Sequence, residues 1–315
     1  MVYTYLDLVK KTDSVPYRGE FAYKEIVEPC YLLLAHDGVA IGRVLPFVVR
    51  HLEGFGPVLK VDHGRRTIKF SPAMDSVSSR SEMIRRIITE WRRNKTFKVL
   101  EAWRDELYAV YHPDHNVYLL IERAAAAIFG FVTYGIHLIG YVPGETQDDI
   151  RIWVPRRAKT KPTFPGMLDN TVAGGIGYPY GINETVVKEC YEEAGLSEDY
   201  VVKNAMPAGV ISYEHQAEAT IESEAGFFQP EVEYIFDLKM DPEVEPTVVD
   251  GEVESFKLMT LPEVKEALKN GEFKYNTAMV TIDFMIRWGY ISADKEPDYL
   301  EIVQRCHRRL DFPII

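Results

Sequence analysis

Three glutamates near the middle of the chain are its clearest candidates for chemistry. Glu189, Glu192 and Glu193 follow an i, i+3, i+4 pattern, so a single helix would carry all three carboxylates on one side. Like charges at this spacing destabilise a helix by ~0.2–0.5 kcal/mol per pair. A cluster of carboxylate oxygens is the ligand set that Mg²⁺ takes, together with phosphate oxygens from a substrate. A solvated acidic helix face is the alternative interpretation.

The rest of the same segment predicts a short helix that packs against a sheet. Its opposite face is apolar and consists of Val186, Val187, Cys190 and Ala194. We expect Asn183 to cap the N-terminus, because its side chain can accept a backbone N–H. We expect Gly195 to end the helix in the left-handed conformation.

Residues 174–196, GGIGYPYGINETVVKECYEEAGL, resemble the Nudix box, whose signature ends in R-E-U-x-E-E-x-G-U, where U is aliphatic. The matching positions are Gly174, Glu189, Glu192, Glu193, Gly195 and Leu196. Tyr180 stands where the signature has its first Glu, and Lys188 stands where it has Arg. In that family the two usual residues brace the loop against the helix. We therefore expect Glu184 and Lys188, four residues apart, to form a replacement ion pair.

The resemblance implies metal-assisted hydrolysis of a diphosphate, with Mg²⁺ as the cofactor and Mn²⁺ as an alternative. It assigns the metal to the Gly174 carbonyl and the carboxylates of Glu189, Glu192 and Glu193. Glu189 is also a candidate base, and family members often recruit a further acidic residue, for which Glu252 and Glu231 are candidates. We assign catalytic roles to Glu189, Glu193 and Glu252. Among crowded carboxylates one titrates high, as a base near neutral pH requires.

Two basic segments are candidate anion sites. The first, just ahead of the box, is a candidate phosphate clamp and contains Arg156, Arg157, Lys159 and Lys161. An exposed loop has similar weight for this segment, and Lys188 is either structural or a further phosphate contact. The second segment lies on an expected helix and contains Arg85, Arg86, Arg92 and Arg93. A solvated helix face is the favoured interpretation there.

Composition limits the classes of partner. The 315 residues include 36 Lys and Arg against 48 Asp and Glu, a net charge of -12. This balance argues against nucleic acid and anionic membranes as partners and leaves a small-molecule diphosphate. The few cysteines indicate a reducing compartment without disulfides or a zinc site. We expect a cytoplasmic protein, with the nucleus not excluded, because no signal peptide or membrane span is evident. The sequence leaves the oligomeric state open.

The hydrophobic pattern changes near residue 124 and predicts two domains, 1–124 and 125–315. Residues 30–46, 58–72 and 106–123 read as hairpins, and 79–94 reads as an amphipathic helix. Beyond residue 125 we expect strands in 130–143, 150–158, 227–240 and 250–261, and helices in 261–271, 276–289 and 298–310. The fold class is α/β (α+β): a mixed sheet with helices on both faces, as in the Nudix α-β-α sandwich, preceded by a smaller α+β domain.

A closer resemblance concerns the substrate. Segments such as IWVPRRAKTKPTFPGMLDNTVAGGI and FQPEVEYIFDL are similar to a Nudix branch that carries an extra N-terminal domain and is associated with thiamine pyrophosphokinase. This resemblance implies hydrolysis of thiamine diphosphate or its oxo and oxy forms to the monophosphate and phosphate. The alternatives are a nucleoside-diphosphate-X hydrolase acting on ADP-ribose or a nucleotide sugar, an allylic diphosphate isomerase, and a non-catalytic binding module. Tyr213 and Trp153 are candidates to stack on a ring, although ordinary strand aromatics are favoured.

Overall fold

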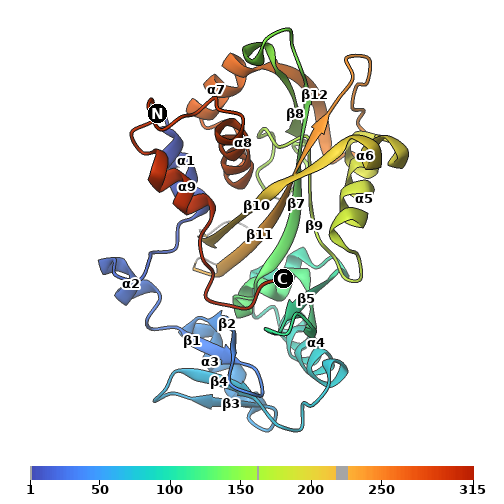
Figure 1. Ribbon diagram of the computed structural model, residues 1–315. Helices are drawn as coiled ribbons and strands as arrows, with labels where there is room; N and C mark the ends of the chain where they lie inside the picture. The colour runs from blue at the N-terminus through green and yellow to red at the C-terminus, as the bar shows by residue number, and fades with distance from the viewer. Residues whose placement is uncertain (1, 162, 218–225) are drawn as a thin grey trace.

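The computed structural model describes residues 2–161, 163–217 and 226–315 as two units, one above the other in Figure 1. The N-terminal unit contains a sheet with strand order β2-β1-β4-β3, in which only the β1–β4 pair is parallel. The strands are β1 (Tyr31–Leu34), β2 (Ala40–Val44), β3 (Leu59–Asp62) and β4 (Thr67–Phe70). Both hairpins expected in this part of the chain are confirmed.

Helix α4 (Val77–Arg93) packs its apolar face into the core of this unit, as expected from its periodicity. The core side chains that it contributes are Ile84, Ile87, Ile88 and Trp91. A third hairpin, β5 (Leu107–Tyr111) with β6 (Val117–Glu122), is also confirmed. Shorter helices complete the unit: α2 (Phe21–Ile26), α3 (Pro46–Leu52), η1 (Glu53–Phe55), η2 (Lys98–Ala102) and η3 (Arg123–Phe129).

The second unit is built on a mixed sheet with strand order β10-β11-β7-β8-β12. Its strands are β7 (Thr133–Val142), β8 (Arg151–Arg157), β9 (Val172–Gly175), β10 (Ala205–Gln216), β11 (Phe228–Lys239) and β12 (Val253–Thr260). Strand β9 is an additional partner of β7. The β11–β7 pair is parallel, and the other pairs of this sheet are antiparallel. The short η4 (Gln147–Asp149) lies between β7 and β8.

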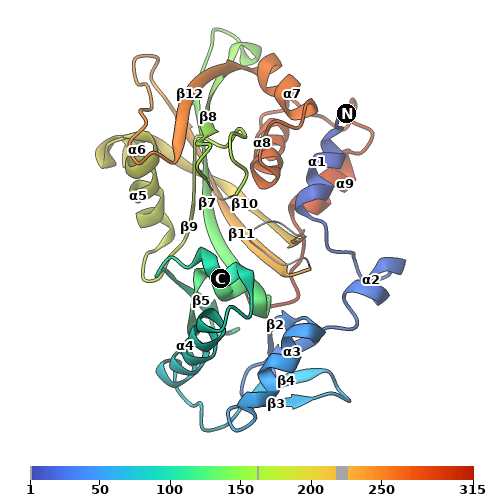
Figure 2. The same cartoon turned by 180° about the vertical axis from the view of Figure 1, so that it is seen from behind.

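Helices cover both faces of this sheet, as Figures 1 and 2 show. On one face lie α5 (Ile182–Ala194) and α6 (Glu198–Asn204), and on the other lie α7 (Leu261–Lys269), α8 (Tyr275–Arg287) and α9 (Tyr299–Cys306). Alternate residues of β7 serve the two faces: Ile136 and Leu138 pack on the α5 side, whereas Ile139 packs on the α8 side. The predicted sandwich with a mixed sheet is confirmed.

Helix α1 (Tyr5–Thr12) belongs to the core of the second unit although it begins the chain. Its Leu8 and Val9 are buried in the same cluster as α8. The backbone N–H of Tyr3 also donates to the carbonyl of Lys269 at 2.8 Å. The sequence contains no local signal for this long-range contact. Apart from α1, the domain boundary near residue 124 stays a prediction.

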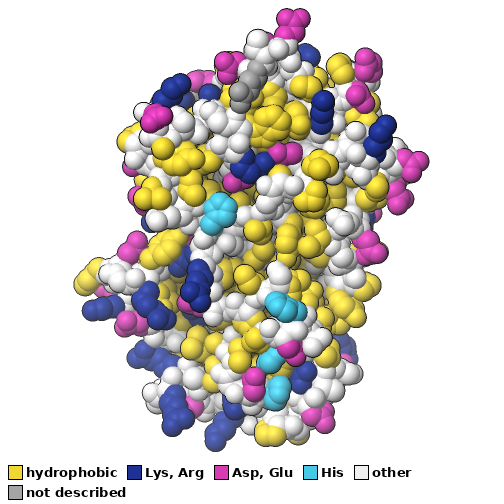
Figure 3. All heavy atoms as spheres, in the orientation of Figure 1, with side chains coloured by type: hydrophobic (Ala, Val, Ile, Leu, Met, Phe, Trp, Pro, Cys, Tyr) yellow, Lys and Arg dark blue, Asp and Glu magenta, His cyan; other side chains and the backbone are white. Residues whose placement is uncertain are grey.

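Charge is not spread evenly over the surface. On the face shown in Figure 3, Lys and Arg side chains gather at the lower left, over the N-terminal unit, whereas acidic side chains are scattered more widely. In the part of the chain that the structure describes, no helix is both long enough and apolar enough to cross a membrane.

Candidate active site

Helix α5 presents the box glutamates to β9. Its Cys190 and Ala194 are buried against the sheet, as expected, and Gly195 ends it in the left-handed conformation with φ +66°. The expected N-cap at Asn183 is wrong, because the helix begins two residues earlier than that cap predicts, at Ile182, with Gly181 at the cap position. The Glu184 carboxylate accepts the Gly181 backbone N–H at 2.8 Å and so supplies the missing cap.

Glu189 lies directly against Gly174 of β9. A Cβ at position 174 would overlap the Glu189 carboxyl group, so only glycine permits this close approach. The Glu189 side chain is 15% exposed. Burial raises the pKa of Glu189, although its ion pair with Lys188 acts in the opposite direction. The structure therefore brings together two positions that the box predicted as metal ligands.

Glu193 reaches the same strand one turn further along α5. Its Oε2 accepts the Ala173 backbone N–H at 3.1 Å. Burial, assisted by the negative charges of Asp169, Glu189 and Glu252, raises the pKa of Glu193 well above its ordinary value. A carboxylate that is costly to ionise in the absence of a cation fits a site that takes a divalent metal.

Lys188 does not form the expected ion pair with Glu184, which is engaged at the helix cap. Its ammonium instead bridges Glu189 Oε1 at 2.9 Å and Glu192 Oε2 at 2.8 Å. Burial alone would lower the pKa of Lys188, but these two carboxylates raise it. Lys188 thus pairs with two of the three box carboxylates. Tyr180, in the preceding loop, is half exposed.

Glu252, the candidate acidic residue outside the box, lies close enough to Glu193 to influence its titration. It forms a hydrogen-bonded ion pair with Lys161, the last residue of the expected phosphate clamp. Burial alone would raise the pKa of Glu252, but Lys161, Arg104 and Arg157 together lower it. Glu252 is therefore ionised and paired, which suits a structural or metal-binding role better than proton transfer.

The other clamp residues point in different directions. Arg157 donates to Asp169 at 2.6 Å and to the carbonyls of Thr163 and Phe164, so it closes the loop that it begins. Arg156 donates to the Gly166 carbonyl at 2.7 Å and lies in a separate hollow with Glu272. Lys159 is exposed, 3.9 Å from Glu254. The structure therefore brings Lys161 and Arg157 towards the carboxylates and places Arg156 and Lys159 elsewhere.

A second polar cluster lies on the α8 face of the sheet beside Gly174. Glu231 and Glu233 alternate along β11 and share the hydroxyl of Tyr213 on β10. A Cβ at Gly135 would overlap the Glu233 carboxylate and would lie 3.1 Å from the Gly174 carbonyl oxygen. Burial and the neighbouring Glu233 raise the pKa of Glu231. The two-residue spacing predicts that Glu231 and Glu233 share one face of this strand, and the structure confirms it, although only Glu231 was a candidate for the further acidic residue.

The cluster continues into the core through His137. Its Nδ1 lies 2.8 Å from Asn170 Oδ1, whose amide group donates to Thr281, so Nδ1 carries a proton. The Nε2 atom lies 3.6 Å from Glu233 Oε1. Tyr213 is therefore a buried hydrogen-bonding residue of this cluster, and Trp153 packs in the core beneath α5. Neither is an open stacking surface.

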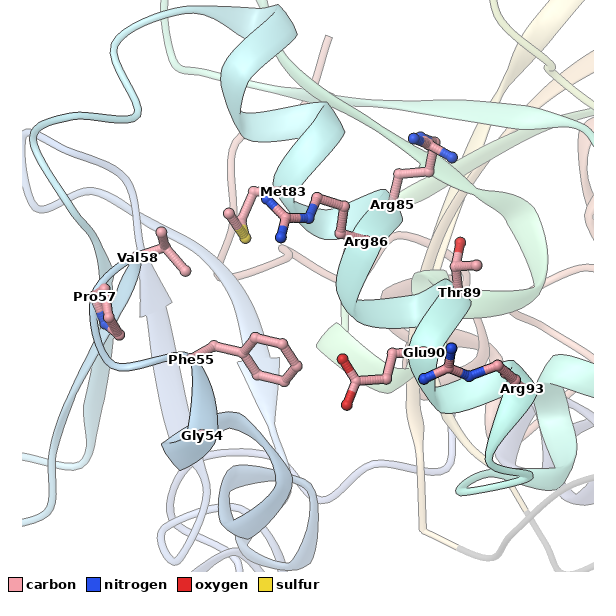
Figure 4. A pocket seen from close by; sticks show the side chains of 10 residues that line it. All are labelled: Gly54, Phe55, Pro57, Val58, Met83, Arg85, Arg86, Thr89, Glu90 and Arg93. Carbon is pink, nitrogen blue, oxygen red and sulfur yellow. The ribbon is translucent and has the colours of Figure 1, made fainter.

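A hollow in the N-terminal unit lies away from these residues. Its cavity volume is about 510 Å³. It lies between the η1 loop and α4, where Phe55 faces Arg86, Glu90 and Arg93, as Figure 4 shows. None of the box residues lines it. Its position therefore gives no support for a substrate at the box.

The donor set at the box fits a hard divalent cation in kind, because it consists of carboxylates and backbone carbonyls. Over residues 2–161, 163–217 and 226–315, no three Asp, Glu, His or Cys side chains already converge to hold a metal ion. Glu189 and Glu192 are held by Lys188, and Glu193 is held by Ala173. A metal at the predicted ligands would therefore compete with Lys188 for the carboxylates of Glu189 and Glu192.

Comparisons with known proteins match both units. Residues 141–278 match the NUDIX domain, and residues 27–133 match a domain of unknown function, DUF4743. An uncharacterized protein of Saccharomyces cerevisiae is 39% identical over 99% of this chain and 93% of its own length. Nudix hydrolase 24, chloroplastic, of Arabidopsis thaliana is 31% identical over 84% of this chain and 73% of its own length. Nudix hydrolase 20, chloroplastic, from the same plant is 37% identical over 67% of this chain and 54% of its own length.

Solved structures are more distant. A Deinococcus radiodurans protein, DR0079, matches with a TM-score of 0.37 and 18% identity, over 64% of this chain and 100% of its own. The NUDIX domain of Shewanella oneidensis NrtR, complexed with ADP ribose, matches with a TM-score of 0.37 and 10% identity, over 50% of this chain and 90% of its own.

Proposed function

Because the chain belongs to the Nudix hydrolase family and is a Nudix-type diphosphate hydrolase, we propose that its substrate is thiamine diphosphate or an oxo or oxy form of it. The observation that carries the catalytic assignment is the seating of Glu189 on Gly174, with Glu193 buried beside it. The thiamine assignment rests on the resemblance of the sequence to the thiamine-associated branch. We propose the cytoplasm as the compartment.

The reaction is hydrolysis of the diphosphate. A water oxygen bonds to the terminal phosphorus, the bridging P–O bond breaks, and the products are the monophosphate and inorganic phosphate. Nudix hydrolases generally use divalent metal ions such as Mg²⁺, which here would neutralise charge on the phosphates. The Gly174 carbonyl and the carboxylates of Glu189, Glu192 and Glu193 would hold the metal.

The surrounding residues perform separate tasks in this scheme. Lys188 neutralises the negative charges of Glu189 and Glu192 in the absence of a metal ion. Lys161 holds Glu252 beside the box, where its negative charge acts on Glu193. The raised pKa of Glu193 or Glu189 suits acceptance of a proton from water. We propose Glu189 as the base, because it lies against Gly174.

The polar cluster beside Gly174 supports a substrate whose organic part is positively charged. Glu231 and Glu233 lie on the α8 face of the sheet, near Gly174, and supply negative charge there when they are ionised. A thiazolium ring gains from nearby negative charge, whereas a ribose needs neutral hydrogen-bonding partners for its hydroxyls. The cluster therefore favours a thiamine-type substrate over the alternative, ADP-ribose or a nucleotide sugar.

The other two alternatives receive less support. An allylic isomerase of this fold needs a cysteine at the reacting centre, but Cys30, Cys190 and Cys306 are all buried. Burial raises the pKa of the Cys190 thiol, which packs beneath α5. A non-catalytic binding module does not require three intact box glutamates.

The deciding experiment measures kcat/KM with Mg²⁺ for thiamine diphosphate, its oxo form, ADP-ribose and a nucleoside triphosphate. We expect the thiamine compounds to be preferred by at least tenfold. A preference of that size for either nucleotide would overturn the thiamine assignment and leave the hydrolase assignment in place. Hydrolysis of none of the four compounds would favour the binding module.

A further inference from the structure

The loop of the box rests on the N-terminal unit. In Figures 1 and 2 the segment between β9 and α5 descends to β5. The backbone N–H of Tyr178 donates to the Leu107 carbonyl at 2.7 Å. A Cβ at Gly177 would lie 2.8 Å from Glu106 Oε1. The two units therefore meet at the residues that lead into the candidate metal site.

The contact is tightest at Gly175, the residue after the predicted carbonyl ligand. A Cβ there would overlap the Tyr108 hydroxyl, and it would lie 3.5 Å from Arg123 Cζ. The Arg123 side chain is 36% exposed and lies over the Tyr108 ring, with its Cζ 5.4 Å from the ring centroid. A guanidinium from the N-terminal unit thus lies beside the box glycines.

Most donors of this guanidinium are free for another partner. Arginine has five N–H donors, and within the described residues Arg123 uses one of them, from Nη1 to Glu106 Oε2 at 2.9 Å. Burial alone would lower the pKa of Arg123, but Tyr108, Glu106 and Glu231 raise it, so it stays charged. A partly buried arginine with free donors matches the geometry of phosphate oxygens.

The cations predicted from the sequence are differently placed. Arg157 is occupied by Asp169 and two carbonyls, and Lys161 is occupied by Glu252. The carboxylates of Glu189 and Glu193 beside the box loop repel a diphosphate unless cations compensate them. Arg123 supplies such a charge from outside the box-bearing unit.

We propose that Arg123 binds the diphosphate group of the substrate beside Gly175, so that the N-terminal unit completes the active site. Tyr108 is a positioning residue, because its ring lies beneath the guanidinium and its hydroxyl lies against Gly175. Glu106 occupies one donor of Arg123 and would compete with the phosphate for it. The inference rests on the proposed function only in taking the ligand to be a diphosphate.

The test measures binding of methylenediphosphonate, a non-hydrolysable diphosphate, by calorimetry in the presence of Mg²⁺. We expect Arg123→Met to weaken binding at least tenfold and Arg123→Lys to recover only part of that loss, because an ammonium keeps the charge but not the planar fork of donors. The matched control is Arg85→Met, which removes an arginine of the same unit that is paired with Glu82. It should leave binding within twofold of the wild type.

Glu106→Gln separates a direct contact from a structural role. If Arg123 contacts the phosphates, freeing it from Glu106 leaves binding unchanged or stronger. If the ion pair only supports the loop, Glu106→Gln weakens binding as much as Arg123→Met does, and the inference fails. It also fails if Arg123→Met binds as tightly as the wild type.

Kinetics distinguish this inference from the proposed function. We expect Arg123→Met to raise KM for thiamine diphosphate with a smaller change in kcat, because the diphosphate is present before and during the reaction. A wild type that hydrolyses no thiamine compound but binds methylenediphosphonate through Arg123 overturns the proposed function alone. Unchanged probe binding and KM in Arg123→Met, with normal hydrolysis in the wild type, overturn the inference alone.

Discussion

Helices α4 and α5 both carry like-charged side chains, yet the fold treats the two sets differently. On α4, Arg85 pairs with Glu82 through two bonds of 2.8 Å, and Arg92 lies over Trp103 with its Cζ 4.5 Å from the ring centroid. Arg85 is 62% exposed, whereas Glu189 on α5 is 15% exposed. The glutamates of α5 face β9, and the arginines of α4 border an open hollow (Figure 4).

The difference lies in solvation. Water screens like charges on an exposed helix, so their repulsion is weak and the chain tolerates them without any function. Burial makes the two carboxylates resist ionisation, and it raises the pKa of both Glu189 and Glu193, although Lys188 opposes this effect at Glu189. Carboxylates with strongly raised pKa values gather at sites that bind a ligand or catalyse a reaction. Helix α5 is therefore a stronger candidate for chemistry than α4.

The largest expected effect separates the two helices directly. Glu193→Gln should lower kcat by orders of magnitude, because it removes one of the carboxylates that would hold the metal. Glu90→Gln, at the α4 hollow, is the matched control and should stay within about twofold. Phosphate release with saturating Mg²⁺ provides the measurement. If Glu193→Gln keeps near-normal turnover, α5 is not the catalytic helix.

A glycine pair extends the comparison to the backbone. Gly174→Ala places a Cβ on the Glu189 carboxyl group and must displace it. A displacement near 1 Å at a reacting site lowers the rate on the order of 10²-fold. Gly54→Ala, beside the α4 hollow, meets nothing within 4 Å and should leave kcat unchanged. Equal activity of the two variants would show that contact between Gly174 and Glu189 is not needed.

The variant Glu193→Gln should lower activity but raise the thermal stability of the metal-free protein at high pH. With EDTA present, the folded protein keeps a proton on Glu193 above pH 4.5, while the unfolded chain releases it. The contribution of Glu193 to the free energy of unfolding is therefore fully present at low pH, and it is lost as the pH rises towards the raised pKa. Glu193→Gln lacks this loss, so at pH 8 its Tm should exceed that of the wild type by about 2–4 °C per kcal/mol removed.

Calorimetry across pH 4 to 8 checks this expectation. Adding Mg²⁺ should stabilise the wild type more than Glu193→Gln, because ligand binding stabilises only the folded state that binds it. A wild type that is more stable than Glu193→Gln at pH 8 in EDTA would indicate that Glu193 is ionised and compensated in the folded protein.

The smallest effect is expected at Lys188. Lys188→Ala frees Glu189 and Glu192, and partly exposed ion pairs contribute only ~0.2–1 kcal/mol to stability. We expect kcat/KM to change by less than about tenfold, with Arg85→Ala on α4 as the inert counterpart. A loss as large as that of Glu193→Gln would place Lys188 on the substrate.

Local patterns in the sequence determined most elements and the central motif. The three hairpins of the N-terminal unit, the apolar face of α5 and its end at Gly195 follow from alternation, helical spacing and glycine, which depend on near neighbours. The clustering of the box glutamates on one helix has the same origin. Asn183 was a reasonable cap by residue type, but Glu184 could reach Gly181 just as well, and local preference alone did not decide between them.

Only the tertiary structure decided which charges meet. It placed α1 on α8, turned Arg156 away from the box, paired Lys161 with Glu252 and brought Glu233 next to Gly174. It also brought Arg123 to Gly175 from the other unit. These contacts join residues far apart in the chain, where spacing carries no information. Their energies depend on burial, because the same carboxylate is inexpensive to ionise in water and costly beside other carboxylates in the interior.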